Sequence, residues 1–299
     1  MNHARVAYRR KQMATLTKNS YGKDRVRLTK VVRTSARHEL HEYTAFLRLY
    51  GSAFEAVYVE DDNSYCVPTD TMKNAVYMIA KTKEFGSPEE FALLLTDHFV
   101  RRIDHVERCE VWIEQNVWSR ILVEGKEHDH AFTKQHYRRT ARCDHAKGAG
   151  EQGEMLELRG GVTGLEVLKT SGSSFSGFLK DSYTTLPETN ERILATTVDA
   201  KWKFRSADAG HSFNSDAERA LRVLLEVFAT HQSPSLQSTL LLVGQRILDS
   251  VTTIQEIEMT MPNQHHILFD LSRFGKSNNN EIFYGTDAPS GVIQGTVSR

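Results

Sequence analysis

The stretch Ser87-Pro88-Glu89-Glu90 carries three signals for the start of a helix within four residues. A serine at the N-cap accepts a hydrogen bond from a free backbone N–H, and a proline suits the first helical position. A glutamate three residues after the serine completes a capping box. The pair Ser233-Pro234 repeats the start of this motif in the other half of the chain. The repetition predicts that each half contains the same module.

Segments with alternating apolar residues surround the predicted helices in both halves, and such alternation is typical of antiparallel strands with one buried face. The strands are expected near residues 42–50, 106–114, 121–124, 165–170, 196–204, 254–261 and 266–271. Each half therefore follows the order strand, strand, helix, helix, strand, strand. We predict an α+β fold of tandem modules, each an antiparallel sheet with two helices on one face.

Another predicted helix precedes each repeated motif. One covers about residues 70–81, and the other follows Ser215 and Glu218, which together indicate a second capping box. Apolar residues recur at helical spacing in both helices. They are Met72, Ala75 and Ile79 in the first helix, and Ala217, Ala220, Leu221, Leu224, Leu225 and Phe228 in the second.

The two modules are expected to meet in a glycine-rich stretch that includes Gly148, Gly150 and Gly153. The expected boundaries are residues 1–17 for a loose basic tail, 18–150 for the first module and 151–299 for the second. A four-stranded sheet of this kind has unpaired edges, so assembly with further copies of the chain is expected to close them.

The composition excludes several classes of partner. Lysine and arginine together number 38, and so do aspartate and glutamate, so the net charge gives no reason to expect nucleic acid or an anionic membrane surface. No apolar run reaches the roughly 18 residues of a membrane-spanning helix. Cys66, Cys109 and Cys143 lack the Cys-x-x-Cys spacing of thiolate zinc sites. A ligand must therefore be recognised by a local site.

The run from Ser174 to Arg192 pairs an aromatic side chain, Phe175, with the guanidinium of Arg192. A phenyl ring can lie over a planar heterocycle, and a guanidinium can meet two in-plane acceptors with charge-assisted, bidentate hydrogen bonds. A lysine cannot form such a fork. The run therefore indicates a site for a flat, anionic, nitrogen-rich heterocycle.

Four ordered segments resemble the signature segments of the urate oxidase (uricase) family. They are Tyr21-Gly22-Lys23-Asp24, residues 68–74, the run 174–192, and Met261-Pro262-Asn263-Gln264-His265. The resemblance implies the tunnelling fold, in which tandem modules assemble into barrel-shaped tetramers with active sites between subunits. It also implies oxidation of urate by molecular oxygen and water to 5-hydroxyisourate and hydrogen peroxide, without a cofactor or a metal.

The resemblance further implies which residues are catalytic. Lys23, Thr69 and His265 would form a proton relay, in which a desolvated lysine acts as the base. Thr69 would arrive from the neighbouring subunit and, with Asn263, would hold molecular oxygen and later water above the ring plane. From the residues alone, Thr69 and Asp70 can also be interpreted as the cap of the helix that begins there.

The substrate would be held between the side chains of Arg192 and Gln237. Arg192 and Gln237 would bind opposite sides of the purine, and Phe175 would stack on its face. The backbone N–H of Leu236 and the dipole of the helix that begins at Ser233-Pro234 would also attract an anion. The implied substrate-binding residues are Thr69, Asp70, Phe175, Arg192, Leu236, Gln237 and Asn263.

A histidine-rich segment leaves a metal site as an alternative. His128-Asp129-His130 could place two ligands on one face of a strand, and His136, Cys143 and His145 follow nearby. No third and fourth ligand stand at a recognised interval. A zinc-dependent pterin or purine hydrolase of the same fold is therefore one alternative function, and a non-catalytic purine-binding protein is the other.

The ends of the chain indicate its location. The first 20 residues contain five basic and no acidic residues, and they lack the apolar core of a signal peptide. The C-terminal residues Val297-Ser298-Arg299 differ from the Ser-Lys-Leu type of address that peroxisomal members of the family carry. We therefore expect a bacterial, cytoplasmic protein.

Overall fold

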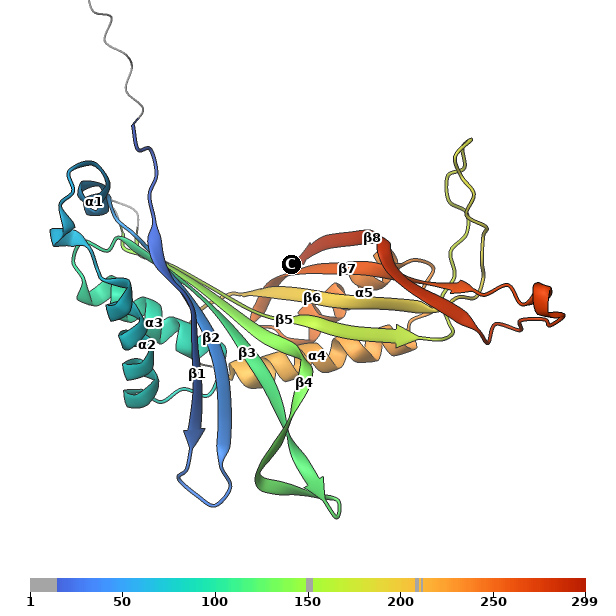
Figure 1. Cartoon of the computed structure of the whole chain (residues 1–299), viewed down its shortest axis with the longest axis horizontal. Helices are drawn as coiled ribbons and strands as arrows, with labels where there is room; N and C mark the ends of the chain where they lie inside the picture. Colours follow the sequence, from blue (N-terminus) through green and yellow to red (C-terminus); the bar gives the residue numbers. More distant parts are fainter. Residues whose placement is uncertain (1–14, 149–152, 208–209, 211) are drawn as a thin grey trace, which may run out of the picture.

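The computed structural model describes residues 15–148, 153–207, 210 and 212–299. These residues form one antiparallel sheet of eight strands, in which every strand lies beside its neighbours in the sequence (Figure 1). The elements of the first half are β1 (Tyr21–Val32), β2 (Glu39–Tyr50), α2 (Thr69–Thr82), α3 (Pro88–Arg102), β3 (Arg108–Val123) and β4 (Lys126–Ala146). The elements of the second half are β5 (Met155–Lys169), β6 (Leu194–Phe204), α4 (Phe213–Thr230), α5 (Leu236–Ser250), β7 (Ile254–Leu268) and β8 (Phe283–Ser298).

Both halves follow the same order of strands and helices, which confirms the predicted repeat and the α+β class. Short helical turns lie outside this repeat. They are η1 (Ser52–Phe54), α1 (Glu55–Val59), η2 (Asn63–Tyr65) and η3 (Ser272–Phe274). Gly150 in the expected joint and most of the expected basic tail lie outside the described residues. The boundary between the modules therefore stays a prediction.

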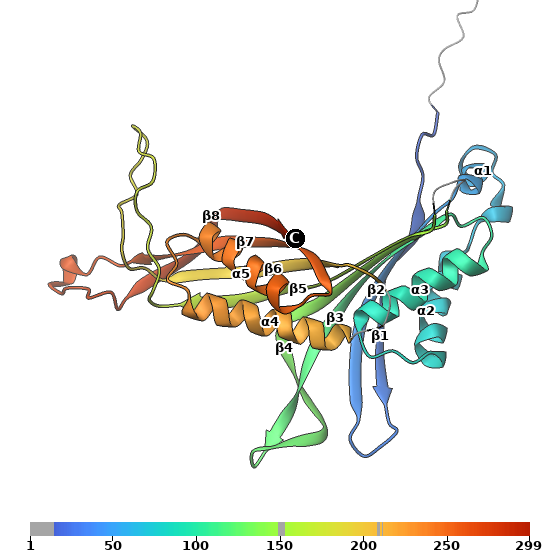
Figure 2. The ribbon, with the colours of Figure 1, turned by 180° about the vertical axis from the view of Figure 1, so that it is seen from behind.

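The helices cover one face of the sheet, as the view from behind in Figure 2 shows. α2 packs on β1, α3 on β3 and β4, α4 on β5, and α5 on β7 and β8. Strand residues that point toward the helices are fully buried, among them Leu47, Val111, Val198 and Met259. The hydrophobic core therefore lies between helices and sheet, and the prediction of two helices on one face of each half is confirmed.

The helix start predicted at Ser87 is confirmed. The starts predicted at Ser233 and at Ser215 are wrong. Ser87 Oγ accepts a hydrogen bond from the N–H of Glu90 at 3.1 Å, and Glu90 Oε2 accepts one from the N–H of Ser87 at 3.0 Å. In contrast, α5 is capped by Ser235 and α4 by Ser212.

The shifts in these two helix starts have separate physical causes. The hydroxyl of Ser233 lies 2.6 Å from Thr239 Oγ1 inside the protein, so it does not cap the helix, and Ser235 takes that place. α4 starts earlier than expected because Phe213 is a buried residue of its first turn. The apolar face of α4 is also narrower than predicted, since Leu225 is 41% exposed.

The expected strands occur, but several of them are parts of longer strands. β3 unites the expected segments 106–114 and 121–124, and β7 unites 254–261 with the start of 266–271. Pairing with neighbouring strands continues across the polar residues that interrupt the apolar alternation. β1, β4 and β8 were not located from the sequence, because long parts of these strands are exposed and lack an apolar pattern.

A buried polar cluster joins the two halves beneath the helices. Arg139 of β4 donates from Nη2 to Glu89 Oε2 at 2.8 Å, and from Nη1 to Asn214 Oδ1. Asn214 Nδ2 in turn donates to the carbonyl of Gly86 at 3.0 Å. Glu89 is fully buried, and a Cβ atom at Gly160 would lie 2.6 Å from its Oε1. The cluster therefore ties the first turn of α3 to the first turn of α4.

None of the helices in the described part of the chain is long and apolar enough to cross a membrane. β1 and β8 form the two edges of the sheet, and each pairs on one side only within the described residues.

Candidate functional site

The segment between β5 and β6 brings Phe175 and Arg192 together. Phe175 and Thr189 exchange backbone hydrogen bonds of 2.8 and 3.0 Å, and the N–H of Arg192 donates to the carbonyl of Ser173 at 2.9 Å. These bonds fold the segment back on itself. As a result, Cζ of Arg192 lies 5.2 Å from the centroid of the Phe175 ring. The pairing that the sequence indicated therefore exists as a contact between the two side chains.

Arg192 carries a charge that the described residues leave without an ion pair. The side chain is half-buried, and burial lowers the pKa of its guanidinium. An arginine still keeps its proton under any physiological condition. Its Nε donates to Ser173 Oγ at 3.3 Å, which is a neutral acceptor. A half-buried cation without a carboxylate partner is suited to an anionic ligand.

The first turn of α5 lies against the base of the same segment. Ser174 N–H donates to the carbonyl of Ser233 at 2.8 Å, and Ser233 N–H donates to the carbonyl of Gly172 at 2.9 Å. Leu236 and Gln237 are the first two residues of α5, Leu236 buried and Gln237 exposed. Backbone N–H groups in a first turn have no partner within the helix, so they can bind an anion.

β7 contributes the polar residues Asn263 and His265. Asn263 lies opposite Thr196 of β6 and Gly291 of β8, and the register with β8 shifts between Asn263 and His265. The shift accompanies a contact between the two side chains, in which Asn263 Nδ2 lies 3.4 Å from His265 Nδ1. The two side chains are therefore neighbours in the last part of β7.

Lys23, Thr69 and Asp70 form a separate group in the first half. Lys23 lies in β1 just before a register shift with β2, and Asp70 is bound by Lys73 and by Asn74. Lys73 is the main cause that lowers the pKa of Asp70, and the charge of Lys23 adds to it. Lys23 therefore lies in the same region as Asp70.

The interpretation of Thr69 as a helix cap is wrong. Thr69 is already the first residue of α2, and the N-cap position is taken by Pro68, which has no side chain able to accept a hydrogen bond. The side chain of Thr69 is exposed at the start of the helix. It is therefore accessible to a ligand or to another chain.

Within one chain, the candidate residues of the first half lie far from those of the second half. In Figure 1, β1 and α2 lie at one end of the sheet, and the segment between β5 and β6 projects from the opposite end. Figure 2 shows the same separation from behind. β1, which carries Lys23, and β7, which carries His265, are separated by five strands of the sheet, so a single chain does not bring these two residues together.

The histidine-rich segment is distributed along the β3–β4 hairpin. The rings of His128 and His130 meet edge to face at 4.5 Å, but His145 lies at the other end of β4, where it binds Glu154. Cys143 is buried, with its Sγ 3.2 Å from Thr96 Oγ1. Among the described residues, no group of three or more His, Cys, Asp or Glu side chains is placed to hold a metal ion.

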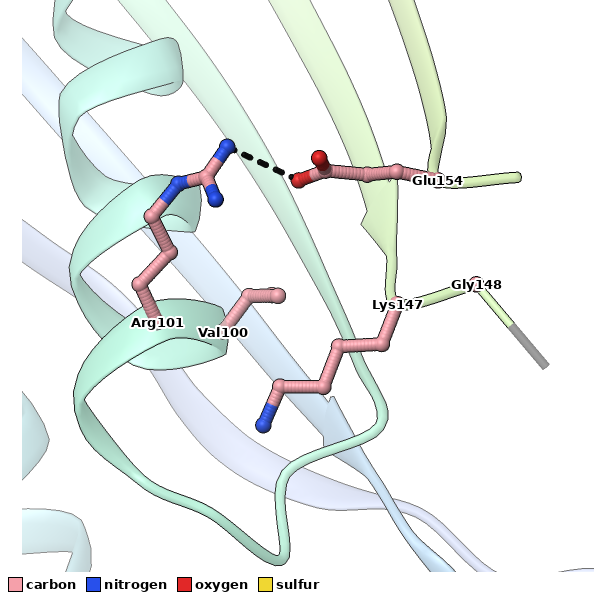
Figure 3. A pocket seen from close by; sticks show the side chains of 5 residues that line it. All are labelled: Val100, Arg101, Lys147, Gly148 and Glu154. Atoms are coloured by element: carbon pink, nitrogen blue, oxygen red, sulfur yellow. Dashed lines mark hydrogen bonds and ion pairs between the residues drawn. The ribbon is translucent and has the colours of Figure 1, made fainter.

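Within the described part of the chain, a pocket and a groove lie away from most of these residues. A small pocket of about 290 Å³ lies at the end of α3, where Arg101 forms a 3.0 Å ion pair with Glu154 (Figure 3). Lys147 points instead toward the turn after α3 and donates to the carbonyls of Ile103 and Asp104. A groove of about 1080 Å³ follows the sheet and is lined mainly by charged residues, together with Phe46 and Trp112. Neither cavity is lined by a predicted catalytic or substrate-binding residue, although Asp24 of the first signature segment lines the groove.

The uricase family model matches residues 19–142 and 158–294, which include every predicted catalytic and substrate-binding residue. The chain belongs to the uricase family. It is 40% identical to the uricase of Arthrobacter globiformis over 95% of this chain and 90% of the relative. It is 35% identical to the uricase of Dictyostelium discoideum over 96% of this chain and 98% of the relative.

Solved structures of the family share this architecture. The crystal structure of the Arthrobacter globiformis uricase superimposes with a TM-score of 0.88, at 39% identity, over 96% of each chain. The urate oxidase of Bacillus sp. TB-90, at 23% identity, superimposes with a TM-score of 0.82 over 94% of this chain and all of the other. The tunnelling fold expected from the resemblance is therefore confirmed.

Sequence reasoning missed several buried hydroxyl groups around the candidate residues of the second half. Thr196 is fully buried opposite Asn263, and its Oγ1 has no hydrogen-bond partner among the described residues. Ser173, Ser233 and Thr239 are also buried; Ser173 contacts Arg192, and Ser233 contacts Thr239 of α5. Serine and threonine are common everywhere in a chain, so only their burial distinguishes these four.

Proposed function

We propose that the protein oxidises urate with molecular oxygen and water, giving 5-hydroxyisourate and hydrogen peroxide. The observation that carries this proposal, in a member of the uricase family, is the geometry of Arg192. Its half-buried guanidinium has no ion pair among the described residues and lies 5.2 Å from the Phe175 ring. A planar purine anion satisfies both groups at once, since its face can stack on the phenyl ring while its edge meets the cation.

The substrate is held between Arg192 and the start of α5. Arg192 donates to carbonyl and ring-nitrogen acceptors on one edge of urate, and the amide of Gln237 binds the other edge. The free N–H of Leu236 adds a further donor to the anion. The backbone bonds between Ser233 and residues 172–174 support this assignment, because they hold the start of α5 beside the segment that carries Arg192.

The chain's own residues supply the proton transfers. Lys23, with Thr69 and His265, removes a further proton from the urate anion, and the resulting dianion is electron-rich enough to reduce oxygen. General base catalysis of this kind contributes about a hundred- to ten-thousand-fold. Arg192 stabilises the accumulating charge. Asn263 and Thr69 hold oxygen first, and then the water that displaces peroxide.

A complete site requires a second copy of the chain. β1 and α2, which carry Lys23, Thr69 and Asp70, lie at the end of the sheet opposite to the segment between β5 and β6, so a neighbouring subunit would bring these residues to the substrate. Asp70 then lies beside the bound substrate together with Thr69. The edge strands β1 and β8 are available for pairing with other copies, and a barrel-shaped homotetramer would use both edges.

An oxygen electrode and a peroxide assay test the proposal together. Adding urate should cause oxygen uptake and the release of one peroxide for each oxygen consumed, and overnight treatment with a chelator should leave both unchanged. Loss of activity after chelation would indicate the zinc-dependent alternative. Tight urate binding without oxygen uptake would indicate a purine-binding protein that is not an enzyme.

A further inference from the structure

We propose that Ser173 is a positioning residue, which sets the direction of the Arg192 guanidinium and its spacing from α5. This inference rests on the proposed role of Arg192 in substrate binding. Ser173 lies at the base of the segment between β5 and β6 and is only 2% exposed. It contacts Arg192 through two separate groups, its backbone carbonyl and its hydroxyl.

The two contacts have different effects. The backbone N–H of Arg192 donates to the Ser173 carbonyl at 2.9 Å, which fixes where the Arg192 side chain leaves the main chain. The hydroxyl of Ser173 accepts from Nε of Arg192 at 3.3 Å, which fixes the orientation of the guanidinium plane. With Nε occupied, the two terminal nitrogens remain as the paired donors of the fork. Ser173 therefore selects an end-on, bidentate approach to the ligand.

Ser173 also connects Arg192 to the start of α5, the helix that carries Gln237. It forms a parallel bridge with Ser233, which is likewise 2% exposed. Ser233 Oγ lies 2.6 Å from Thr239 Oγ1 and 3.0 Å from the carbonyl of Ser235, so Ser233 is attached to the N-terminal end of α5. Hydrogen bonds from Arg192 to Ser173, and from the adjoining residues Gly172 and Ser174 to Ser233, thus connect Arg192 to the start of the helix that carries Gln237.

The hydroxyl of Ser173 can be removed without removing the bridge. The bonds from Ser174 to Ser233, from Ser233 to Gly172 and from Arg192 to Ser173 all use backbone atoms, so they persist when the side chain becomes alanine. What is lost is the acceptor for Nε. The guanidinium then has to be oriented when urate binds, and this weakens binding more than it slows the chemical step.

The test compares the assembled wild-type enzyme with Ser173→Ala and Ser174→Ala, using urate and measuring oxygen uptake. Ser174 is the matched control, because its side chain makes no hydrogen bond to another described residue. Ser173→Ala should raise KM about tenfold, as expected for one hydrogen bond to a charged group, with kcat changed by less than about twofold. Ser174→Ala should leave both constants unchanged. Equal KM values for the two variants would overturn the inference.

A double-mutant cycle separates action through Arg192 from general damage to the loop. Urate binding is measured without oxygen, so that no turnover occurs. In an Arg192→Ala background, Ser173→Ala should weaken urate binding by less than about twofold. The same tenfold loss in that background would overturn the inference.

A second variant covers the case in which Ser173→Ala does not fold. Ser173→Cys nearly keeps the volume but offers only a weak acceptor, so it should show the same rise in KM. A folded Ser173→Cys enzyme with a wild-type KM would overturn the inference. Absence of urate binding and oxidation by the wild type would instead overturn the proposed function, and the two failures are therefore distinguishable.

Discussion

Replacing Arg139 with methionine should destabilise the protein, and the loss should depend on pH. Arg139 is the charged partner of Glu89, which is fully buried, whereas the Arg139 side chain itself is 14% exposed. Burial raises the pKa of the Glu89 carboxyl, and Arg139 opposes that effect. Without Arg139 the folded protein must either keep a buried unpaired carboxylate or protonate Glu89.

Protonation sets an upper limit on the cost. The carboxyl has an ordinary pKa of 4.5, and each pH unit of forced protonation costs about 1.36 kcal/mol. Because the pKa of Glu89 is already raised in the wild type, the part of the loss that comes from Glu89 should be at most about 3 kcal/mol at pH 7 and at most about 1 kcal/mol at pH 5.5. The loss grows with pH because the pKa of Glu89 is raised in the folded variant. Its stability is retained below the ordinary pKa of the carboxyl and is lost as the pH rises toward the folded value.

Urea unfolding at a fixed protein concentration measures the effect at pH 5.5, 7 and 8, as a difference between wild type and variant at each pH. Arg101→Met is the matched control, because Arg101 forms ion pairs with Asp97 and Glu154 but is 59% exposed. Its loss should change stability much less than Arg139→Met does, because solvent screens an exposed ion pair. A loss for Arg139→Met that equals the control, or that does not grow with pH, would refute the reasoning.

Three further outcomes are expected. Lys23→Met should reduce turnover while urate affinity stays close to wild type, because the base acts after the substrate is bound; stopped-flow turnover and anaerobic binding measure the two, and equal losses would contradict that role. Arg192→Ala should weaken urate affinity by about 2 to 4 kcal/mol, and unchanged affinity in a titration would remove Arg192 from the site. Gly160→Ala should cost about 1 to 3 kcal/mol in urea unfolding, because the added Cβ would lie 2.5 Å from Trp202 Nε1 and 2.6 Å from Glu89 Oε1; a stability equal to wild type would show that this region yields easily.

Local signals in the sequence predicted the parts of the fold that depend on near neighbours in the chain. The capping box at Ser87 involves residues three apart, so its hydrogen bonds could be predicted from sequence spacing alone. The same logic failed at Ser233, whose hydroxyl is used by Thr239 instead of the helix end. That choice depends on burial, which a four-residue motif does not contain.

In the candidate site, too, residue type was readable from the sequence, whereas burial and strand register were not. Phe175 and Arg192 were singled out by residue type, and the structure brings them within 5.2 Å, although 16 residues lie between them. Thr196 was not found, because a buried threonine looks in the sequence like any other strand threonine. The register of β6 with β7, which places Thr196 opposite Asn263, is a property of the assembled sheet.

The amino-acid sequence by itself determined the repeated module, the α+β class and the four segments that resemble the uricase family. These follow from periodicity, capping residues and motif order, which are all readable along the chain. Only the tertiary structure decided that Ser173 contacts Arg192, and that β1 and α2, which carry Lys23 and Thr69, lie at the opposite end of the sheet from the segment between β5 and β6. The reason is that strand register and burial arise from contacts between residues distant in sequence, and no local spacing specifies those contacts.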